Sequence, residues 1–459
     1  MAARRRVRRV TLVNQFFPPD LAPTAHLTAA LAGHLADRGW EVTVITAGDG
    51  YVDRSTDGDG SATDGTRVHA DVRVLRPWIP ALGKASIVKR LTDYVTFLAG
   101  SWWRLLRLPR QDVVISLTTP PFVVVGAVAH KLLRRRTRVV LWSMDCYPDV
   151  IERLGSRTGG DGAVPATTGG RRTVPSIRSA VRPLVSLRRG GPMSRVLRSI
   201  NRWVFRHLDH VVALDEAMRD LLLDGYGTAD GGPPTTVIPN WESLADFPPT
   251  DASTISPWPT YERDDLAGRF VVLYLGNLGY GHRIETVVDA AASLDPDEDV
   301  AWLFVGGGAR WDELGRLADE AVSSPAIVRH PYVAKELTPA VMAGAGCALI
   351  VLADEALGVM SPSKLHANLA AGLPILYVGP AGSNVDEAIE RFDCGVSIRS
   401  GDAGGLVAAL RRLQADPDWR DELAANARRA FEEAYSDRVT LARWDTVLTA
   451  TTSVDLPDR

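Results

Sequence analysis

Short unbroken runs of hydrophobic residues alternate along this chain with longer stretches in which hydrophobic residues recur every three or four positions. A short run is typical of a buried strand, and the wider spacing is typical of an amphipathic helix. Strands are predicted in the first half at residues 10–13, 41–46, 72–75, 113–117, 139–142 and 210–214. Helices are predicted between them, among others at residues 24–38, 122–133 and 216–224. This alternation predicts a parallel sheet covered by helices on both faces.

The same alternation begins again in the second half. Strands are predicted at residues 271–275, 301–305, 327–329, 348–352, 375–378 and 395–398, and helices at 284–293, 403–414 and 419–435. Proline-containing segments at 239–241, 247–249 and 257–259 separate the two halves. We therefore predict an α/β chain with two Rossmann-like, doubly wound domains facing a cleft, residues 1–240 and 241–435. A C-terminal helix and tail, residues 436–459, is expected to cross back to the first domain.

Two segments follow neither pattern. Residues 49–65 are rich in Gly, Asp, Ser and Thr, and residues 157–191 are rich in Gly, Thr, Pro and Arg. We expect mobile loops at both places, the second of them lid-like. A chain of 459 residues is long for one hydrophobic core, which agrees with two domains.

Charge and cysteine content exclude several classes of protein. A net charge of −3 gives no reason to expect a nucleic acid partner. Cys146, Cys347 and Cys394 are too scattered for a disulfide framework or a zinc site, and they fit a reducing cytosol. The uncharged residues 113–129 contain two prolines and fall short of the ~20 residues that a membrane span needs. The basic residues 4–9 precede only a short apolar stretch, which predicts a strand rather than a signal peptide.

Three segments of the second half have the composition of an anion site. In residues 361–374, Ser363 and Lys364 lie in the predicted first turn of a helix, where free N–H groups and the helix dipole favour an anion. A glycine-rich turn at 276–282 follows a predicted strand, and His282 and Arg283 come before the next helix. A second glycine turn lies at 306–308. Each glycine turn could also be a tight connection without a ligand, and Ser363 could simply cap its helix.

The segment 361–374 resembles the donor-binding segment of retaining family-4 glycosyltransferases of the GT-B fold. The resemblance is strongest to the subgroup of bacterial polysaccharide and lipid-linked glycan biosynthesis, whose motif is Pro-Ser-Lys-Leu-Tyr-Glu-Tyr-x-Ala-Ala-Gly. It implies a GT-B architecture with the nucleotide-sugar on the second domain and the acceptor on the first. The residues that it implies for donor binding are Gly276, Asn277, Gly279, His282, Arg283, Gly306, Gly307, Tyr332, Val333, Ser363, Lys364, His366 and Asn368.

Three segments of the first half carry the same resemblance: residues 14–24, 117–122 and 142–149. They imply a set of acceptor or cleft-loop residues that consists of Asn14, Pro19, Asp20, Thr24 and Thr119. Asp145 ends a predicted buried strand at the cleft edge, where a carboxylate is poorly explained by packing. We expect Asp145 to orient the acceptor or the donor sugar and Lys364 to stabilise the diphosphate that leaves. The alternative for Asp145 is a cap on the following turn.

One departure from the family bears on activity. The family often places two Glu eight positions apart, and Val359 and Ala367 occupy those positions here. Neither side chain can accept a hydrogen bond, so His366 or Asn368 would have to replace the ribose contact.

The implied function is transfer of a hexosyl or N-acetylhexosaminyl group, with retention, from a nucleotide diphosphate donor such as a UDP-sugar. The acceptor would be a lipid-linked or polysaccharide glycan, and the family implies neither a metal nor a cofactor. A GT-B partner protein without turnover is the alternative, on the evidence of Val359 and Ala367. A nucleotide-sugar epimerase of the same architecture is weaker, because no acid pair lies at the expected places.

Two predicted helices are basic and amphipathic. The apolar face of the first consists of Ile87, Leu91, Tyr94, Val95, Leu98, Trp102 and Leu105. In the second, residues 195–207, arginines lie on one side and Val196, Ile200, Trp203 and Val204 on the other. Such helices suit an anionic membrane surface, and packing against the core is the alternative. We favour the membrane for the first helix and the core for the second, and so expect a cytoplasmic protein peripheral to the plasma membrane.

Overall fold

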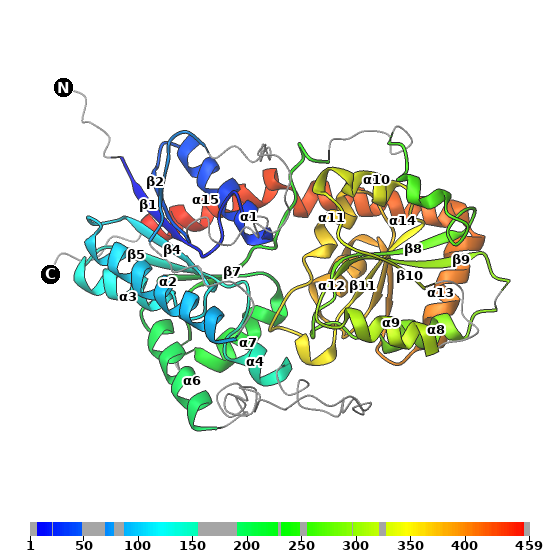
Figure 1. Cartoon of the computed structure of the whole chain (residues 1–459). Coiled ribbons are helices and arrows are strands. Elements are labelled where there is room, and N and C mark those ends of the chain that lie inside the picture. Colours follow the sequence, from blue (N-terminus) through cyan, green and yellow to red (C-terminus); the bar gives the residue numbers. More distant parts are fainter. Residues whose placement is uncertain are drawn as a thin grey trace.

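The computed structural model describes residues 7–20, 22–47, 69–77, 87–154, 191–227, 231–247, 255–295, 297–320 and 327–453. Apart from residue 191, both predicted loops lie outside these residues. Two lobes lie side by side, each built on a parallel sheet with helices packed around it (Figure 1). The predicted fold class, two doubly wound α/β domains, is confirmed.

The N-terminal domain contains a seven-stranded sheet in the order β3-β2-β1-β4-β5-β6-β7. Its strands are β1 (Arg9–Val13), β2 (Glu41–Ile45), β3 (Val72–Leu75), β4 (Val113–Leu117), β5 (Arg138–Trp142), β6 (His210–Ala213) and β7 (Thr235–Val237). Its helices are α1 (Pro23–Asp37), α2 (Ile87–Arg107), α3 (Val124–Leu133), α4 (Asp149–Leu154), α6 (Pro192–Phe205) and α7 (Glu216–Tyr226). Every residue of the central strand β4 is buried, as expected for a parallel sheet covered on both faces.

The C-terminal domain contains a six-stranded sheet in the order β10-β9-β8-β11-β12-β13. Its strands are β8 (Phe270–Asn277), β9 (Val300–Gly307), β10 (Ile327–His330), β11 (Cys347–Val351), β12 (Ile375–Val378) and β13 (Gly395–Ile398). Its helices are α8 (Glu285–Ala292), α9 (Trp311–Glu320), α10 (Thr338–Ala343), α11 (Lys364–Ala370), α12 (Asn384–Phe392), α13 (Ala403–Ala415) and α14 (Pro417–Ala430). A π-helical turn, Phe431–Tyr435, then leads into α15 (Asp437–Ser453).

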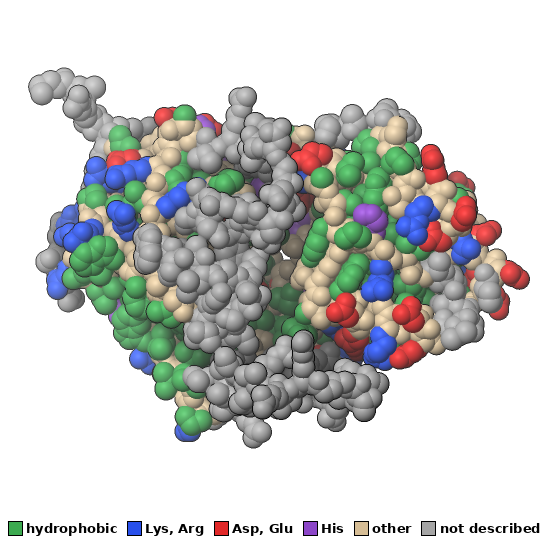
Figure 2. Space-filling model, viewed as in Figure 1, with side chains coloured by type: hydrophobic (Ala, Val, Ile, Leu, Met, Phe, Trp, Pro, Cys, Tyr) green, Lys and Arg blue, Asp and Glu red, His purple; other side chains and the backbone are tan. Residues whose placement is uncertain are grey.

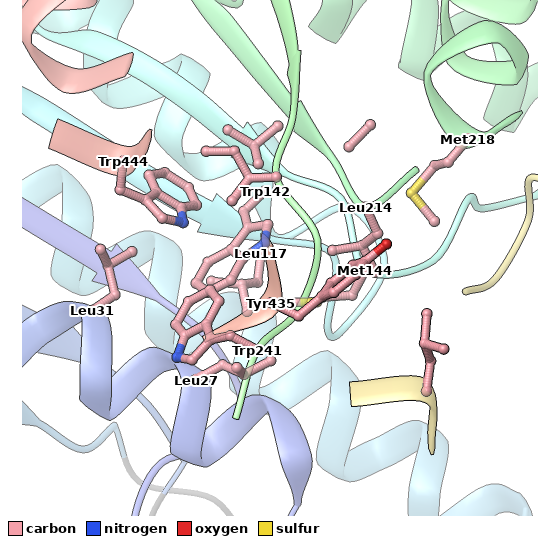
Figure 3. Packing of buried hydrophobic residues seen from close by; sticks show 14 of the residues in the cluster. Leu27, Leu31, Leu117, Trp142, Met144, Leu214, Met218, Trp241, Tyr435 and Trp444 are labelled. Atoms are coloured by element: carbon pink, nitrogen blue, oxygen red, sulfur yellow. The ribbon is translucent and has the colours of Figure 1, made fainter. Parts of the chain in front are cut away.

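The last helix lies across the N-terminal domain (Figure 1). Asp445 of α15 contacts His34 (3.0 Å) and Arg38 (3.1 Å) of α1. Trp444 packs edge-on against Trp142 at the end of β5, with ring centroids 4.8 Å apart (Figure 3). Trp241 of the linker stacks on the same Trp142 ring at 5.6 Å. We call these three tryptophans the hinge cluster. They join the linker and α15, the two segments that connect the domains, to the N-terminal sheet.

A second contact between the domains joins the segment after β5 to the segment before α11. Asp145 forms an antiparallel bridge with Met360, and the Cys146 amide donates to the Val359 carbonyl at 3.1 Å. Arg153 of α4 donates to the Leu357 carbonyl at 3.0 Å. The segment that precedes α11 is therefore held by the N-terminal domain.

Among the residues that the structure describes, no helix has both the length and the apolar character needed to cross a membrane.

Candidate active site

The two glycine turns of the C-terminal domain lie next to each other. In the parallel ladder of β8 and β9, Gly276 lies opposite Gly306 and Asn277 opposite Gly307. Gly306 has φ +147°, and a Cβ atom there would overlap the Gly276 carbonyl oxygen. Only glycine fits this close approach of two backbone segments. The glycines at 276 and 306 thus have a packing role that brings both turns to the same edge of the sheet.

Lys364, the first residue of α11, lies over these turns. Its Nζ atom donates to the Asn277 carbonyl (3.0 Å) and to His282 Nε2 (3.1 Å), and lies 5.0 Å from the centre of the Tyr274 ring. The described residues place no carboxylate in an ion pair with this ammonium. Burial lowers the pKa of Lys364 to about 8, so the group still carries its charge at neutral pH. A partly desolvated cation with only neutral partners favours binding of an anion.

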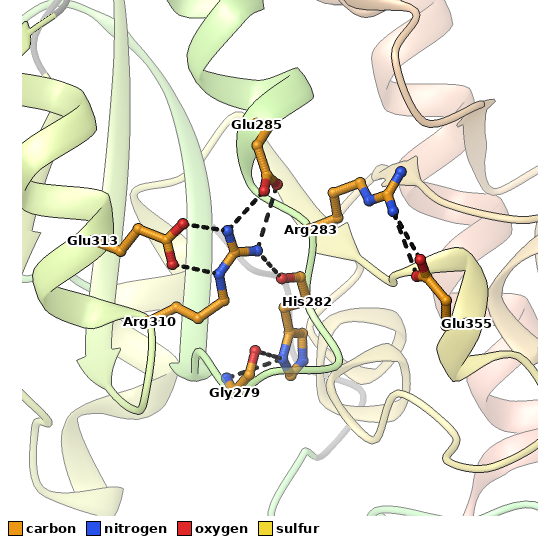
Figure 4. Close-up of polar contacts among 7 residues, drawn as sticks. All are labelled: Gly279, His282, Arg283, Glu285, Arg310, Glu313 and Glu355. Carbon is orange, nitrogen blue, oxygen red and sulfur yellow. Dashed lines mark hydrogen bonds and ion pairs between the residues drawn. The ribbon is translucent and has the colours of Figure 1, made fainter. Parts of the chain in front are cut away.

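His282 holds this ammonium from the other side. Burial, followed by the charges of Lys364 and Arg310, lowers the pKa of His282 to about 3. The ring is therefore neutral, and its Nε2 atom can accept from Lys364. Nδ1 lies 3.0 Å from the Gly279 nitrogen and 3.2 Å from its carbonyl oxygen, which folds the ring back onto its own turn (Figure 4).

The two arginines near this turn have roles that the sequence did not reveal. Arg283 points away from His282 and pairs with Glu355 (3.2 Å) and Asp354 (3.5 Å) (Figure 4). It is therefore not among the groups around Lys364, in contrast to the expectation for donor binding. Arg310, which the sequence did not single out, donates instead to the His282 carbonyl at 2.5 Å.

The residues of α11 other than Lys364 are placed differently from the expectation. Ser363 is exposed and its side chain makes no capping bond, so capping does not explain it. His366 is buried, with its ring against Tyr435 and Nδ1 3.0 Å from the Ser363 carbonyl oxygen, so it lies outside the group around Lys364. Asn368 is also buried, and Val359 is fully buried at the domain contact. The helix has only seven residues, so the charge near the cleft comes from Lys364 rather than from a long helix dipole.

Tyr332 lies at the outer edge of the same site. Its side chain is 62% exposed, its ring borders Gly307, and its hydroxyl lies 3.5 Å from Asn277 Oδ1. Val333, the next residue, packs against the core instead. An exposed aromatic ring beside the glycine turn at 306–308 is a surface on which a nucleobase can stack.

Asp145 of the N-terminal domain lies beside the segment that precedes α11, where it bridges Met360. Its backbone amide and that of Met144 both donate to Thr118 Oγ1, at 3.2 and 3.0 Å. Burial raises the pKa of Asp145 to about 6. Thr118, which the sequence did not single out, thereby fixes the segment that carries this carboxyl group. Thr119, the neighbouring residue, accepts from the Gln15 amide through its carbonyl oxygen.

The first loop of the N-terminal domain is built by its own polar residues. The Asn14 amide group donates to the carbonyl oxygens of Phe16 (2.7 Å) and Thr24 (3.3 Å) and to Thr28 Oγ1 (3.0 Å). Asp20 accepts from the Ala22 amide at 2.8 Å, and Pro19 is exposed. Asn14 and Asp20 therefore shape the loop, and a direct contact of either with an acceptor stays a prediction.

Among the described residues, no group of three His, Cys, Asp or Glu side chains is arranged to hold a metal ion. The group that the structure brings together thus consists of Lys364, His282, Asn277, Tyr332 and the glycine turns, and a role for Asp145 beside them stays a prediction.

Two family models match this chain in tandem. Residues 24–241 match the glycosyl transferase 4-like domain, and residues 263–430 match glycosyl transferases group 1. The Escherichia coli (strain K12) protein assigned to colanic acid biosynthesis as glycosyl transferase WcaI is 23% identical over 400 residues, which are 86% of this chain and 89% of that protein.

Solved structures agree on the fold. Sucrose-phosphate synthase from Thermosynechococcus elongatus superimposes with a TM-score of 0.67 at 15% identity, over 98% of this chain and all of that one. HepE of Anabaena, in complex with UDP and glucose, superimposes with a TM-score of 0.63 at 15% identity, over 96% of this chain and all of HepE. The matched domains and relatives favour an enzyme over a partner protein without turnover. The chain belongs to the glycosyltransferases of the GT-B type.

Proposed function

We propose that this glycosyltransferase takes a sugar from a nucleotide diphosphate, a UDP-sugar first among the candidates, and that the diphosphate binds at Lys364. The observation that carries the proposal is the Lys364 ammonium, whose partners among the described residues are all neutral, beside two glycine turns and the exposed Tyr332 ring. The structural neighbour HepE, solved with UDP and glucose, supports the choice of a uracil nucleotide.

In the proposed reaction, the bond between the anomeric carbon and the diphosphate oxygen breaks, and its electron pair stays on the diphosphate. An acceptor hydroxyl oxygen bonds to the anomeric carbon, and its proton passes to the diphosphate. Lys364 stabilises the negative charge that develops there, and the backbone N–H groups of the turns at 276–282 and 306–308 add to this effect. Asp145 orients the acceptor or the donor sugar. Retention at the anomeric carbon follows from the resemblance to family 4, as does a hexosyl or N-acetylhexosaminyl donor.

The acceptor is proposed to be a lipid-linked or polysaccharide glycan, because the matched E. coli relative is assigned to colanic acid biosynthesis. A thermal-shift panel of UDP-, GDP- and dTDP-sugars identifies the donor, since a ligand that binds only the folded state raises the melting temperature. With that donor and a membrane lipid extract as the acceptor source, wild type should release nucleoside diphosphate. Asp145→Asn should retain the thermal shift and lose most of this release. A wild type that no nucleotide sugar stabilises would refute the proposal.

Contact with a membrane surface is a second part of the proposal, and the structure changes which helix would make it. On α2, Leu105 is buried and Trp102 donates its Nε1–H to the Val123 carbonyl at 3.2 Å, so this face packs on α3. On α6, Val196 is 54% exposed and Trp203 is 36% exposed. The preference for core packing of the second helix holds for Val204, which is 1% exposed, and for Ile200, which packs against the core, but not for Val196 and Trp203. On the first helix, Leu98 also packs against the core, whereas Val95 is 55% exposed.

We propose that α6 and the neighbouring end of α3 form the membrane-facing surface, the α3/α6 face. Hydrophobic and basic side chains gather over these helices in Figure 2. The exposed apolar residues of this face are Leu132, Leu133, Met193, Val196 and Trp203. Exposed arginines on it include Arg134, Arg135, Arg195, Arg202 and Arg206, and neither helix contains Asp or Glu. Apolar side chains among arginines fit an anionic bilayer surface.

Sedimentation with lipid vesicles tests this surface. Wild type should sediment with vesicles that contain anionic lipid, remain in solution with neutral vesicles, and be released by salt. Replacing Val196 and Trp203 with Ser should abolish sedimentation and leave the cooperative melt intact. Leu337→Ser, on an exposed apolar residue of the other domain, is the matched control and should not change it. Equal sedimentation of all three proteins would contradict the assignment.

A further inference from the structure

Arg310 is a buried arginine at the base of the candidate donor site. It follows the glycine turn at 306–308 and comes directly before α9, and its side chain is only 8% exposed. Nε and Nη2 donate to the Glu313 carboxylate at 2.8 and 2.7 Å, and Nη2 also donates to Glu285 at 2.8 Å (Figure 4). Both carboxylates are more than one third exposed, so they reach the guanidinium from the surface side.

Two further contacts of Arg310 go to the turn at 276–282. Its Nη1 atom donates to the His282 carbonyl at 2.5 Å, and its backbone amide donates to the Leu278 carbonyl at 3.1 Å. One residue therefore holds this turn at two carbonyl oxygens four positions apart. The two carboxylates fix the plane of the guanidinium, and this fixes the direction in which it meets His282.

The position of His282 matters because its ring is one of the two hydrogen-bond acceptors of the Lys364 ammonium. A shift of the His282 backbone would move the ring away from Lys364 or rotate its Nε2 atom. The charge of Arg310 also helps to lower the pKa of His282, which keeps the ring neutral and able to accept. Arg310 thus affects the Lys364 ammonium indirectly: it fixes the position of His282 and helps to keep the His282 ring neutral.

We propose that Arg310, held by Glu285 and Glu313, is a positioning residue that sets the Lys364–His282 pair for the diphosphate of the donor. This inference rests on the proposed function of Lys364. A purely structural ion pair would stabilise the domain without any coupling to Lys364.

Arg310→Lys tests the proposal, because lysine keeps the charge but cannot reach both carboxylates and the His282 carbonyl at once. Arg316→Lys is the matched control, since Arg316 of α9 pairs with Glu320 and is 60% exposed. Arg310→Lys should weaken binding of the preferred nucleoside diphosphate about tenfold, the loss of one well-placed charge-assisted hydrogen bond. Arg316→Lys should bind as wild type does.

A double-mutant cycle separates positioning from general destabilisation. In a Lys364→Ala background, Arg310→Lys should cause no further loss of affinity, because both changes act on the same contact. If the two losses multiply, or if Arg310→Lys binds like wild type, the proposal is overturned. Should Arg310→Lys lose its cooperative melt, Glu313→Gln serves the same cycle, because it loosens one side of the guanidinium and keeps the arginine.

NMR of the histidine side chains in the ligand-free protein tests the positioning role of Arg310 independently of the proposed function. The His282 signals, assigned by a His282→Gln variant, should move in Arg310→Lys and stay unchanged in Arg316→Lys. An unchanged His282 environment overturns the positioning role, whatever the ligand proves to be. A wild type that binds no nucleotide, but whose His282 signals respond to Arg310→Lys, would instead contradict only the function proposed for Lys364.

Discussion

Raising the pH through the pKa of Lys364 is predicted to weaken donor binding. The diphosphate favours the ammonium form, and burial lowers the pKa of this group to about 8 in the free protein. Affinity should therefore be constant near pH 7, fall by about tenfold by pH 9, and level off above the pKa of Lys364 in the complex. The phosphate groups do not contribute above pH 7, because their second pKa lies near 6.

The same burial predicts the opposite effect on stability. The pKa of Lys364 falls from 10.5 in the unfolded chain to about 8 in the folded one, so the unfolded chain holds more protons between these values and stability rises with pH there. At pH 7 the charged group costs up to roughly 3 kcal/mol. Lys364→Met should therefore stabilise the protein at pH 7, by up to roughly 3 kcal/mol, and weaken nucleotide binding.

The effect on binding is measured by calorimetric titration with the preferred nucleoside diphosphate between pH 6.5 and 9.5. The effect on stability is measured by urea unfolding of wild type and Lys364→Met at pH 7. Lys364→Arg is the control, because its charge does not titrate in this range, and its binding should be flat across it. A wild-type affinity that is also flat to pH 9.5, or an Arg variant that shows the same fall, would refute the reasoning about Lys364.

Four further changes test other parts of the structure. Gly306→Ala should lower the free energy of unfolding in urea by roughly 1–3 kcal/mol through backbone strain, and by more than that because the added Cβ atom would overlap the Gly276 carbonyl oxygen. Unchanged stability would contradict this. Trp444→Ala should cost about 3–5 kcal/mol in the N-terminal domain, because it removes the edge contact with Trp142; a loss below 1 kcal/mol would contradict the hinge cluster. Burial lowers the pKa of His366 to about 4, so wild type should lose up to about 1.4 kcal/mol per pH unit below pH 6.5, whereas His366→Phe should lack this slope in urea unfolding at several pH values. Ala367→Glu should tighten nucleotide binding about tenfold in titration calorimetry by adding a charge-assisted bond to the ribose, and weaker binding would show that another group already occupies that place.

The sequence predicted the two sheets because their strands are short, rich in hydrophobic residues and buried on both faces. The pattern is clear in β4, where all five residues are buried. Strand β7 was missed because its three residues, Thr235–Val237, are half-buried at the sheet edge and include two threonines. A short edge strand is set by its neighbour in the sheet, which a local pattern does not contain.

The site was predicted in part. The glycine turns could be found because they lie directly after predicted strands, and Lys364 because it lies in the first turn of a predicted helix. Arg283 was placed with the donor because it is next to His282, but its direction is decided by Asp354 and Glu355, some seventy residues later in the chain. Arg310 was missed because its pairing with Glu313, three residues later, resembles an ordinary surface ion pair, whereas Glu285 and the His282 carbonyl lie 25 and 28 residues earlier. Contacts between distant segments leave no local signal.

The two amphipathic helices show the same limit. A helix that packs on the core and a helix that faces a membrane can have the same spacing of apolar residues. Neighbouring elements decide between them: α3 covers Trp102 of α2, whereas Val196 and Trp203 of α6 stay exposed.

The central claim is that Lys364 binds the diphosphate of the donor. Calorimetric titration of wild type and Lys364→Ala with a nucleoside diphosphate and the monophosphate of the same base tests it most directly. We predict that wild type binds the diphosphate at least tenfold more tightly than the monophosphate, because the second phosphate meets the ammonium. We also predict that Lys364→Ala loses this difference and keeps its affinity for the monophosphate. Equal affinity of wild type for both nucleotides, or a preference that survives in Lys364→Ala, would contradict the assignment.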